Sequence, residues 1–264
     1  MGSIREQISI QVSLVIAAVD DFTGRPVSGS QLRVWIDGER PPVAKEGGYY
    51  IFTNLRTAHP VIHLAGPVFH RQEIVLDEKK RMQYEGKVLK VRMIPNRSYP
   101  VPRGTTCVQG HAAPGSTVLA YNKTLKEPFK LLYPYTAGQE EIRIFHPDEM
   151  DLEGKSFCIR NKEGTQQELL QIARQPAAFE TSGLYQLYLP LAHSYRKIGT
   201  VIYPVYVSKA DQAGDFYLPA AGIDTDTAVF VFWMEGGEPR QKEIKLQSGK
   251  VNLLSDTLCT ADRE

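Results

Sequence analysis

The sequence predicts an all-β protein made of two antiparallel β-sandwich domains. Three observations lead to this fold class. Short apolar runs alternate with polar residues at a period of two, which is typical of strands with one buried face. Gly, Pro, Asn and Asp separate the runs at short, regular intervals. No amphipathic helix stands between successive strands, and this disfavours a βαβ arrangement.

The first predicted domain covers residues 1–95. Residues 8–18 alternate over eleven positions, and residues 20–29 then form a bend in which Gly24 and Gly29 allow unusual dihedrals and Pro26 fixes φ. Further strands are predicted at 32–36, 49–52, 61–64, 71–76 and 87–94. The predicted core consists of the inward members of these runs: Ile10, Val12, Leu14, Leu32, Val34, Ile36, Phe52, Ile74, Leu89 and Val91.

A proline-rich linker is predicted at residues 96–104, because Pro100 and Pro102 lack the amide donor that a central strand needs. The second predicted domain covers residues 105–264. Its segment 111–121 repeats the order of residues 24–36, and its segments 213–219, 228–233 and 242–253 repeat the order of the later strands. The second domain is therefore expected to be a diverged copy of the first, with residues 122–209 inserted.

The insert is itself rich in predicted strands, at 129–133, 142–145, 157–160, 184–189 and 200–207. Residues 165–174 fit a short helix and a strand equally well, because their apolar residues are adjacent instead of periodic.

The first domain resembles the transthyretin-like, or carboxypeptidase regulatory-like, β-sandwich. The family pattern T-G-x-P-V-x-G followed by K-x-G-x-Y-x-F is carried here by Thr23, Gly24, Pro26, Val27, Gly29, Lys45, Gly47, Gly48, Tyr50 and Phe52, followed by Asn54 and Leu55. The resemblance covers about residues 8–95, with an echo in 111–121 and 210–254. It implies an accessory, stalk or interaction domain. The His and Arg set of the hydrolases built on transthyretin has no counterpart in this sequence, so the resemblance implies no enzyme activity.

Composition excludes several classes of partner. The 31 basic and 30 acidic residues give a net charge of +1 without long blocks of one sign, so no nucleic-acid partner is expected. No apolar window is long enough to span a membrane, and residues 1–20 lack the apolar core of a signal peptide. Cys107, Cys158 and Cys259 are far apart and are expected to be reduced thiols. These features predict a protein made in the cytoplasm, compatible with a virion-like particle or release by a non-Sec route.

Three clusters of polar residues have types that occur in metal or catalytic sites. His59, His63 and His70 lie within twelve residues, but a zinc site needs a complete ligand set and surface positions are the expected outcome. Asp148, Asp151 and Glu153 lack the spacing of a calcium loop and are expected to form a solvated turn.

His193 and Ser194 are adjacent, so on a strand they point to opposite faces and cannot form a nucleophile–base pair. No catalytic residue, cofactor site or metal site is predicted.

Apolar residues on a second strand face predict a protein interface. Val15, Ala17 and Val19 break the polar alternation of the first strand, and the run 229–233 is apolar on both faces. A sandwich has one inner face, so the second face must meet the insert, the other domain or a partner. The interface candidates are Val15, Ala17, Val19, Trp35 and Trp233.

The predicted function is that of a non-enzymatic structural or adaptor subunit, acting through protein contacts in an assembly such as a phage tail or a contractile injection apparatus. The alternative is a carbohydrate-binding or adhesin-like module, with Trp35 or Trp233 as an exposed stacking platform.

Overall fold

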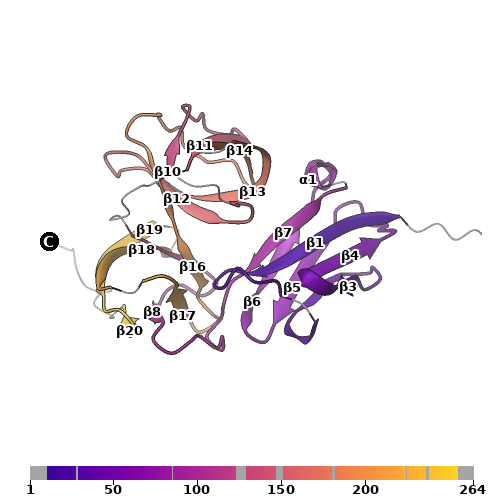
Figure 1. The fold of residues 1–264 in the computed structure, drawn as a ribbon, viewed down its shortest axis with the longest axis horizontal. Coiled ribbons are helices and arrows are strands. Elements are labelled where there is room, and N and C mark those ends of the chain that lie inside the picture. The colour runs from indigo at the N-terminus through magenta and orange to yellow at the C-terminus, as the bar shows by residue number, and fades with distance from the viewer. Residues whose placement is uncertain are drawn as a thin grey trace, which may run out of the picture. The chain divides into compact units, whose positions relative to one another are not determined.

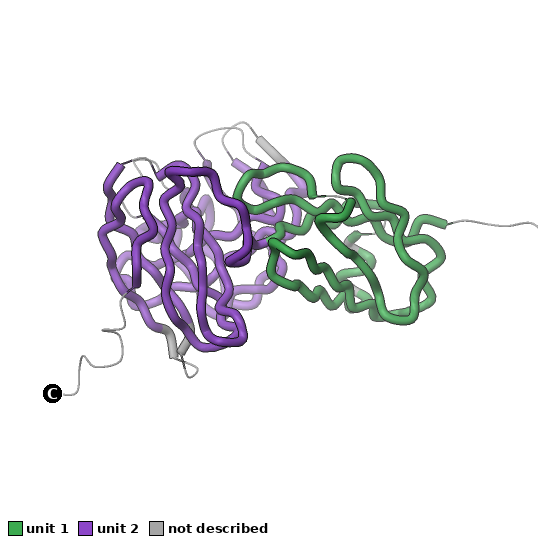
Figure 2. Tube along the Cα trace, turned by 90° about the horizontal axis from the view of Figure 1, so that it is seen from below, with its two compact units in different colours: residues 1–93 green, residues 94–264 purple. Residues whose placement is uncertain are grey.

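The computed structural model describes residues 11–27, 29–84, 86–122, 129–146, 151–179, 182–223, 225–235 and 238–254. Their regular secondary structure is almost entirely strand, which confirms the all-β prediction (Figure 1). Within them there is one α-helix, α1 (Glu78–Gln83), and two 3₁₀ turns, Gly29–Gln31 and Glu46–Gly48. The chain divides into two compact units, residues 1–93 and 94–264 (Figure 2).

Unit 1 contains two sheets. The four-stranded sheet has the order β3-β4-β1-β7, and the three-stranded sheet has the order β2-β5-β6. The strands are β1 (Val12–Asp20), β2 (Arg33–Ile36), β3 (Val43–Lys45), β4 (Tyr49–Thr53), β5 (Val61–Gly66), β6 (Phe69–Val75) and β7 (Val88–Met93). β1 is central in its sheet, since it pairs antiparallel with β4 and parallel with β7.

The bend after β1 is held by its own polar side chains. The Asp20 carboxylate accepts hydrogen bonds from the Phe22 amide at 2.9 Å and the Thr23 hydroxyl at 2.8 Å. At the start of β4, Gly48 has φ 75°, and a Cβ there would lie 2.6 Å from the Ala18 carbonyl oxygen. The second glycine of the Gly47–Gly48 pair is therefore required for the close approach of two backbones.

Most of the predicted core of unit 1 is buried. Leu14, Leu32, Val34, Ile36, Phe52, Leu89 and Val91 are all buried. The prediction that Val12 belongs to the core is wrong, because its side chain is 58% exposed. Val12 is the first residue of β1, and the register with β4 shifts between Val12 and Leu14. Ile74 is half-buried, and Ile10 lies outside the described residues.

Unit 2 contains a pair of sheets and a barrel. The sheets have the orders β16-β9-β18-β19 and β17-β8-β20. Their strands are β8 (Thr106–His111), β9 (Thr117–Tyr121), β16 (Tyr206–Lys209), β17 (Asp215–Ala220), β18 (Thr227–Glu235), β19 (Glu238–Leu246) and β20 (Val251–Leu253). One hydrophobic core includes Val108 and Phe216 from one sheet and Val118, Val231 and Trp233 from the other.

The pairing order of unit 1 recurs in this part of unit 2. β8 pairs antiparallel with β17 and parallel with β20, as β1 does with β4 and β7. The order β9-β18-β19 likewise repeats β2-β5-β6. The remaining strand differs, since β3 extends the first sheet of unit 1 whereas β16 extends the second sheet of unit 2.

The barrel lies in sequence between β9 and β16, within the expected insert. Six antiparallel strands close in the order β10-β11-β14-β13-β12-β15. They are β10 (Phe129–Leu131), β11 (Glu141–Phe145), β12 (Ser156–Arg160), β13 (Gln167–Phe179), β14 (Ser182–Leu187) and β15 (Val201–Pro204). The ambiguous segment 165–174 is thus largely strand. β13 bends with two register shifts against β14, a device that lets a strand curve around a small barrel.

The barrel covers part of the outer face of the β9-β18 sheet. Val118 and Ala120 of β9 point into the sheet pair, so Leu119 and Tyr121 point to the opposite face. Tyr121 is nevertheless fully buried, because its ring stacks on Tyr203 of β15 at 5.2 Å and on Phe230 of β18 at 5.6 Å. The sequence allowed the insert, the other domain or a partner to cover the second apolar face. At this position the insert covers it.

Polar contacts complete this junction. Arg160 Nη1 of β12 donates to the Tyr121 hydroxyl at 3.0 Å, and that hydroxyl donates to Gln167 Oε1 of β13 at 3.2 Å. Burial raises the pKa of Tyr121 to about 12, and the nearby Cys158 adds to the rise. The hydroxyl therefore stays neutral and can act as donor and acceptor at once.

Candidate functional site

A groove of about 830 Å³ opens at one end of the barrel. Its walls come from the turn between β12 and β13 and from the segment between β14 and β15. The lining residues are Pro134, Asn161, Lys162, Glu163, Thr165, Gln166, Ser194, Tyr195, Arg196, Lys197, Ile198 and Thr200.

The first wall is a turn fixed by Asn161. Its amide oxygen accepts from the Gln166 amide at 3.2 Å, and its amide nitrogen donates to the Thr165 hydroxyl at 2.9 Å. Backbone hydrogen bonds from Gly164 to Asn161 and from Asn161 to Gln166 close the turn. This wall is held by local bonds and needs no ligand to form.

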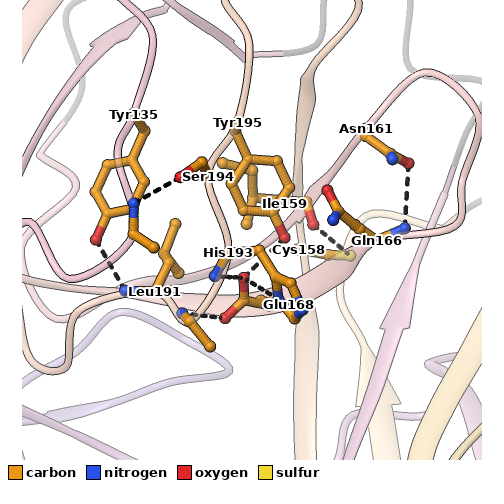
Figure 3. A network of polar contacts seen from close by, with 12 residues as sticks. Tyr135, Cys158, Ile159, Asn161, Gln166, Glu168, Leu191, His193, Ser194 and Tyr195 are labelled. Carbon is orange, nitrogen blue, oxygen red and sulfur yellow. Dashed lines mark hydrogen bonds and ion pairs between the residues drawn. The ribbon is translucent and has the colours of Figure 1, made fainter.

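The second wall is fixed by Glu168 of β13. Its carboxylate accepts from the amides of Ala192 at 2.6 Å and His193 at 2.9 Å, and from the Tyr195 hydroxyl at 3.0 Å. His193 Nδ1 lies 2.9 Å from the same carboxylate. Figure 3 shows these groups around Glu168, whose side chain is only 16% exposed. One carboxylate therefore orders a whole loop.

Tyr135 and Ser194 tie the same wall to the opposite side of the barrel. Tyr135 and Tyr195 exchange two backbone hydrogen bonds of 2.8 Å each, and the Leu191 amide donates to the Tyr135 hydroxyl at 2.9 Å. Ser194 Oγ accepts from the Ala137 amide at 2.9 Å (Figure 3). The segment is thus held from two directions.

Burial and the Glu168 charge together raise the pKa of Tyr195, and burial is the larger cause. The pKa of Tyr135 is raised for the same two reasons, although its hydrogen bond from Leu191 opposes the shift. Both hydroxyls stay protonated across the physiological range, so Tyr195 remains a donor to Glu168.

The groove carries an excess of positive charge. Lys162, Arg196 and Lys197 line it and are exposed, against the single acid Glu163. None of the three cations forms an ion pair with any residue that the structure describes. The Lys162 stem packs on the backbone of Gly199, where a Cβ would lie 2.9 Å from the Lys162 Cβ. The two walls of the groove are therefore in contact at Lys162 and Gly199.

The groove residues form no nucleophile–base pair among the described contacts. His193 contacts Glu168, whereas Ser194 contacts a backbone amide, so the adjacent residues serve different partners. The arrangement can bind and orient a ligand through cations and hydrogen-bonding side chains.

Three of the predicted interface residues lie on β1. Val15 and Val19 are half-buried, and Ala17 is buried. Val15 stands beside Ile51 of β4 and Val88 of β7, and Ile51 stands beside Val43 of β3. Paired residues point to the same side of a sheet, so Val43, Ile51, Val15 and Val88 form an aliphatic row across all four strands. Val43 and Val88 are 50% and 40% exposed.

The two tryptophans lie in different surroundings. Trp233 is buried among the core residues of unit 2 and offers no surface for a partner. Trp35 is half-buried on β2, where its ring stacks on His63 at 5.0 Å. The guanidinium carbons of Arg33 and Arg71 lie 4.8 Å and 5.5 Å from the centre of that ring.

The three histidines of the predicted cluster differ in burial: His59 is exposed, His70 is half-buried and His63 is buried. His63 Nδ1 lies 3.2 Å from Glu73, and His63 Nε2 lies 3.2 Å from Asp37. Among the described residues, no group of three or more His, Cys, Asp or Glu side chains is placed to hold a metal ion.

The carboxylates of the acidic turn accept hydrogen bonds from backbone amides. Asp151 accepts from the Glu153 amide at 3.0 Å, Glu153 accepts from the Gln175 amide at 2.9 Å, and Asp148 lies outside the described residues. The free cysteines Cys107 and Cys158 are buried, and Cys259 also lies outside.

Sequence reasoning missed Glu168 and the groove. Glu168 lies in the segment whose secondary structure was ambiguous, and its partners are 24 to 27 residues away in the chain. A usable signal was present in residues 190–199, where Pro190 and Gly199 enclose a loop that contains Arg196 and Lys197.

No protein-family model, no curated protein and no solved structure matches this chain. Within the described residues, no helix has both the length and the apolar character needed to cross a bilayer.

Proposed function

We propose that this protein is a non-enzymatic structural or adaptor subunit that works through contacts with other protein subunits. The observation that carries the proposal is the aliphatic row on the four-stranded sheet of unit 1. Two of its four side chains are at least 40% exposed, and all four lie next to one another across the sheet. Contiguous apolar surface of this kind is typical of protein interfaces.

The row can supply the driving force for association. Burial of apolar surface stabilises a complex by about 25 cal/mol per Å². The next pair on the same face of the sheet is Ala17 and Tyr49. Tyr49 is 42% exposed and extends the apolar surface of the row. Lys45 and Lys90 flank that position, so the apolar surface has a charged rim, as interfaces commonly do.

An assembly such as a phage tail or a contractile injection apparatus fits a chain of small β modules joined in series. This choice of assembly is made by analogy of architecture. Many unrelated functions use β modules, so the fold alone does not select one of them.

The test is the native mass of the purified protein, measured by light scattering after size-exclusion chromatography. We expect a species larger than the 29.6 kDa chain, and we expect Val15→Lys and Val88→Lys each to reduce it to the monomer with the fold intact by circular dichroism. Val75→Lys is the matched control, because Val75 is 57% exposed on the other sheet of unit 1. A monodisperse wild-type monomer contradicts the proposal.

Carbohydrate binding is the second candidate function, and the observation that favours it is the groove. Asn161, Thr165, Gln166 and Ser194 offer hydrogen-bonding side chains along its walls. The tryptophan platforms do not support it, since Trp233 is buried and Trp35 is already stacked on His63. A neutral glycan array tests this candidate, with binding expected to be lost in Gln166→Ala.

A further inference from the structure

The groove at the end of the barrel carries three cations that form no ion pair with any described residue. Some arginines elsewhere in the chain pair with acids: Arg71 lies 2.8 Å from Glu73, and Arg97 lies 3.6 Å from Asp215. Lys162, Arg196 and Lys197 have no such partner among the described residues. The chain as a whole has a net charge of only +1, so this concentration of charge is local.

The walls that carry the cations are already ordered. The Asn161 turn and the Glu168-bound segment are each held by several hydrogen bonds of 2.6–3.2 Å. A ligand therefore loses little free energy to the ordering of the protein backbone when it binds. Pre-ordered walls that carry cations without a partner among the described residues favour the binding of an anion.

The groove also offers apolar contacts. Ile198 is 90% exposed and lines the groove together with Pro134 and the methylene stems of the lysines. A ligand that fits must present negative charges and aliphatic groups together. The volume of about 830 Å³ lies toward the upper end of the range of about 300–1,000 Å³ for ligand pockets, so the space suits an extended segment.

Two classes of anionic polymer fit these features less well. Single-stranded nucleic acids stack their bases on exposed aromatic side chains, and sugars commonly pack on the same kind of surface. The only aromatic residue in the lining is Tyr195, which is buried and donates to Glu168. A peptide supplies carboxylates for the cations and an aliphatic side chain for Ile198, and it needs no aromatic platform.

From these features we infer that the groove binds an extended acidic peptide segment of a partner subunit, whose carboxylates pair with Lys162, Arg196 and Lys197. This inference rests on the proposed adaptor function and names the chemistry of one of its partners. The groove lies in unit 2 and the aliphatic row in unit 1, so different residues carry the two contacts.

The test is fluorescence anisotropy with a fluorescein-labelled peptide of repeated Glu-Gly-Leu units, added to the full-length protein. A peptide of repeated Lys-Gly-Leu units is the charge control. We expect only the acidic peptide to bind, and we expect a rise from about 0.1 M to about 1 M NaCl to remove most of the binding, since the screening length falls from about 10 Å to about 3 Å.

The variant Lys162→Gln/Arg196→Gln/Lys197→Gln should weaken binding about tenfold, as expected for the loss of three exposed ion pairs. The matched control is Lys87→Gln/Arg103→Gln/Lys245→Gln, which removes the same charges from exposed positions outside the groove lining. This control should bind within twofold of the wild type. Equal affinity of the two triple variants, or no binding of the acidic peptide to the wild type, overturns the inference.

A second measurement needs no variant. Carbodiimide joins a carboxylate to an amine that it already contacts, so the acidic peptide should cross-link to Lys162 or Lys197 of the wild type, as identified by mass spectrometry. Cross-links confined to other lysines overturn the inference. Stronger binding of a heparin tetrasaccharide, lost in the groove variant, assigns the groove to glycans and overturns the peptide class.

The native mass separates this inference from the proposed function. If the groove variant and the wild type bind the acidic peptide equally while Val88→Lys still dissociates the assembly, the groove inference fails and the adaptor function stands. If the acidic peptide binds in the groove as expected but the wild type is a monodisperse monomer, the contact through the aliphatic row fails instead.

Discussion

The equivalent sheets of the two units carry a stacked aromatic pair on their outer faces, but they cover it differently. In unit 1 the pair is Trp35 and His63, with ring centres 5.0 Å apart and planes at 20°. In unit 2 the pair is Tyr121 and Phe230, 5.6 Å apart and at 22°. The first pair is surrounded by charged side chains of its own sheet, and the second lies under the barrel.

This difference shows two ways to deal with a second apolar face. On the β2-β5-β6 sheet, Arg33, Arg71 and Glu73 shield the rings and keep the face compatible with water. On the β9-β18-β19 sheet, the shielding side chains come from outside the sheet. They are Tyr203 and Arg160 of the barrel. The first solution is local in sequence and the second depends on an inserted domain.

The largest expected effect is the truncation of the covered ring. Tyr121→Ala should lower the free energy of unfolding of unit 2 by about 4 kcal/mol, since it removes a fully buried aromatic side chain and its hydrogen bonds. Trp35→Ala should cost unit 1 less, about 1–2 kcal/mol, because that side chain is only partly buried. Differential scanning calorimetry measures both, and equal losses would remove the distinction between the two covers.

The next effect compares a largely buried carboxylate with an exposed one. Glu168→Ala should cost about 2–3 kcal/mol, because it leaves the donors of Ala192, His193 and Tyr195 without their acceptor. Glu73→Ala should cost about 0.5 kcal/mol, since its side chain is 52% exposed.

Hydrogen exchange supplies the local measurement for Glu168. The amides of Ala192 and His193 should exchange faster in Glu168→Ala, whereas Glu163→Ala, which changes an exposed acid of the same groove, should leave them unchanged. Unchanged protection in Glu168→Ala would show that other contacts hold this wall.

A smaller effect separates two buried tyrosines of the barrel. Tyr195→Phe should cost about 1.5 kcal/mol, because the hydroxyl donates to a carboxylate. Tyr185→Phe should be neutral or slightly stabilising, since its buried hydroxyl has no hydrogen-bond partner among the described residues. Urea denaturation measures both, and a loss in Tyr185→Phe as large as that in Tyr195→Phe would contradict this account.

The smallest effect at neutral pH concerns tyrosine ionisation. Burial raises the pKa of Tyr121 and of Tyr185 to about 12 from 10.0, and the Asp151 charge contributes at Tyr185. A folded-state pKa above the unfolded value gives stability that is complete below pH 10 and is lost as the pH rises toward 12. Absorbance of tyrosinate, followed with circular dichroism, should show these tyrosines ionising as unit 2 unfolds. Their ionisation at pH 10 in the folded protein would contradict the assignment.

The features that could be predicted from the sequence are those that depend on the local alternation of apolar and polar residues. The all-β class, the strand at 32–36 and the buried positions Val34 and Phe52 follow from a period of two. The short helix α1 was not predicted, because its only clear sequence signal is Asp77 at the N-cap position. In the structure the Asp77 side chain accepts a hydrogen bond from the Lys80 amide at 2.8 Å. Val12 was misplaced because a register shift is not visible in one strand alone.

Other features depend on contacts between distant parts of the chain. Closure of the barrel needs β10 to pair with β15, about seventy residues later, and alternation carries no information on such pairing. The burial of Tyr121 likewise depends on Tyr203 and Arg160. The second face of residues 229–233 was recognised as apolar, but the choice among insert, domain and partner required the position of the barrel.

The site of the insertion has an evolutionary consequence. β9, which leads into the barrel, and β16, which leads out of it, are hydrogen-bonded neighbours, with Ala120 opposite Tyr206. A short hairpin between these two strands would satisfy the same ladder, so a lineage can gain, lose or exchange the whole barrel without rerouting the other strands of unit 2. Tyr121 limits that freedom, because any replacement must again cover its ring. The other strands of unit 2 can thus keep their pairing while the barrel is exchanged as one piece.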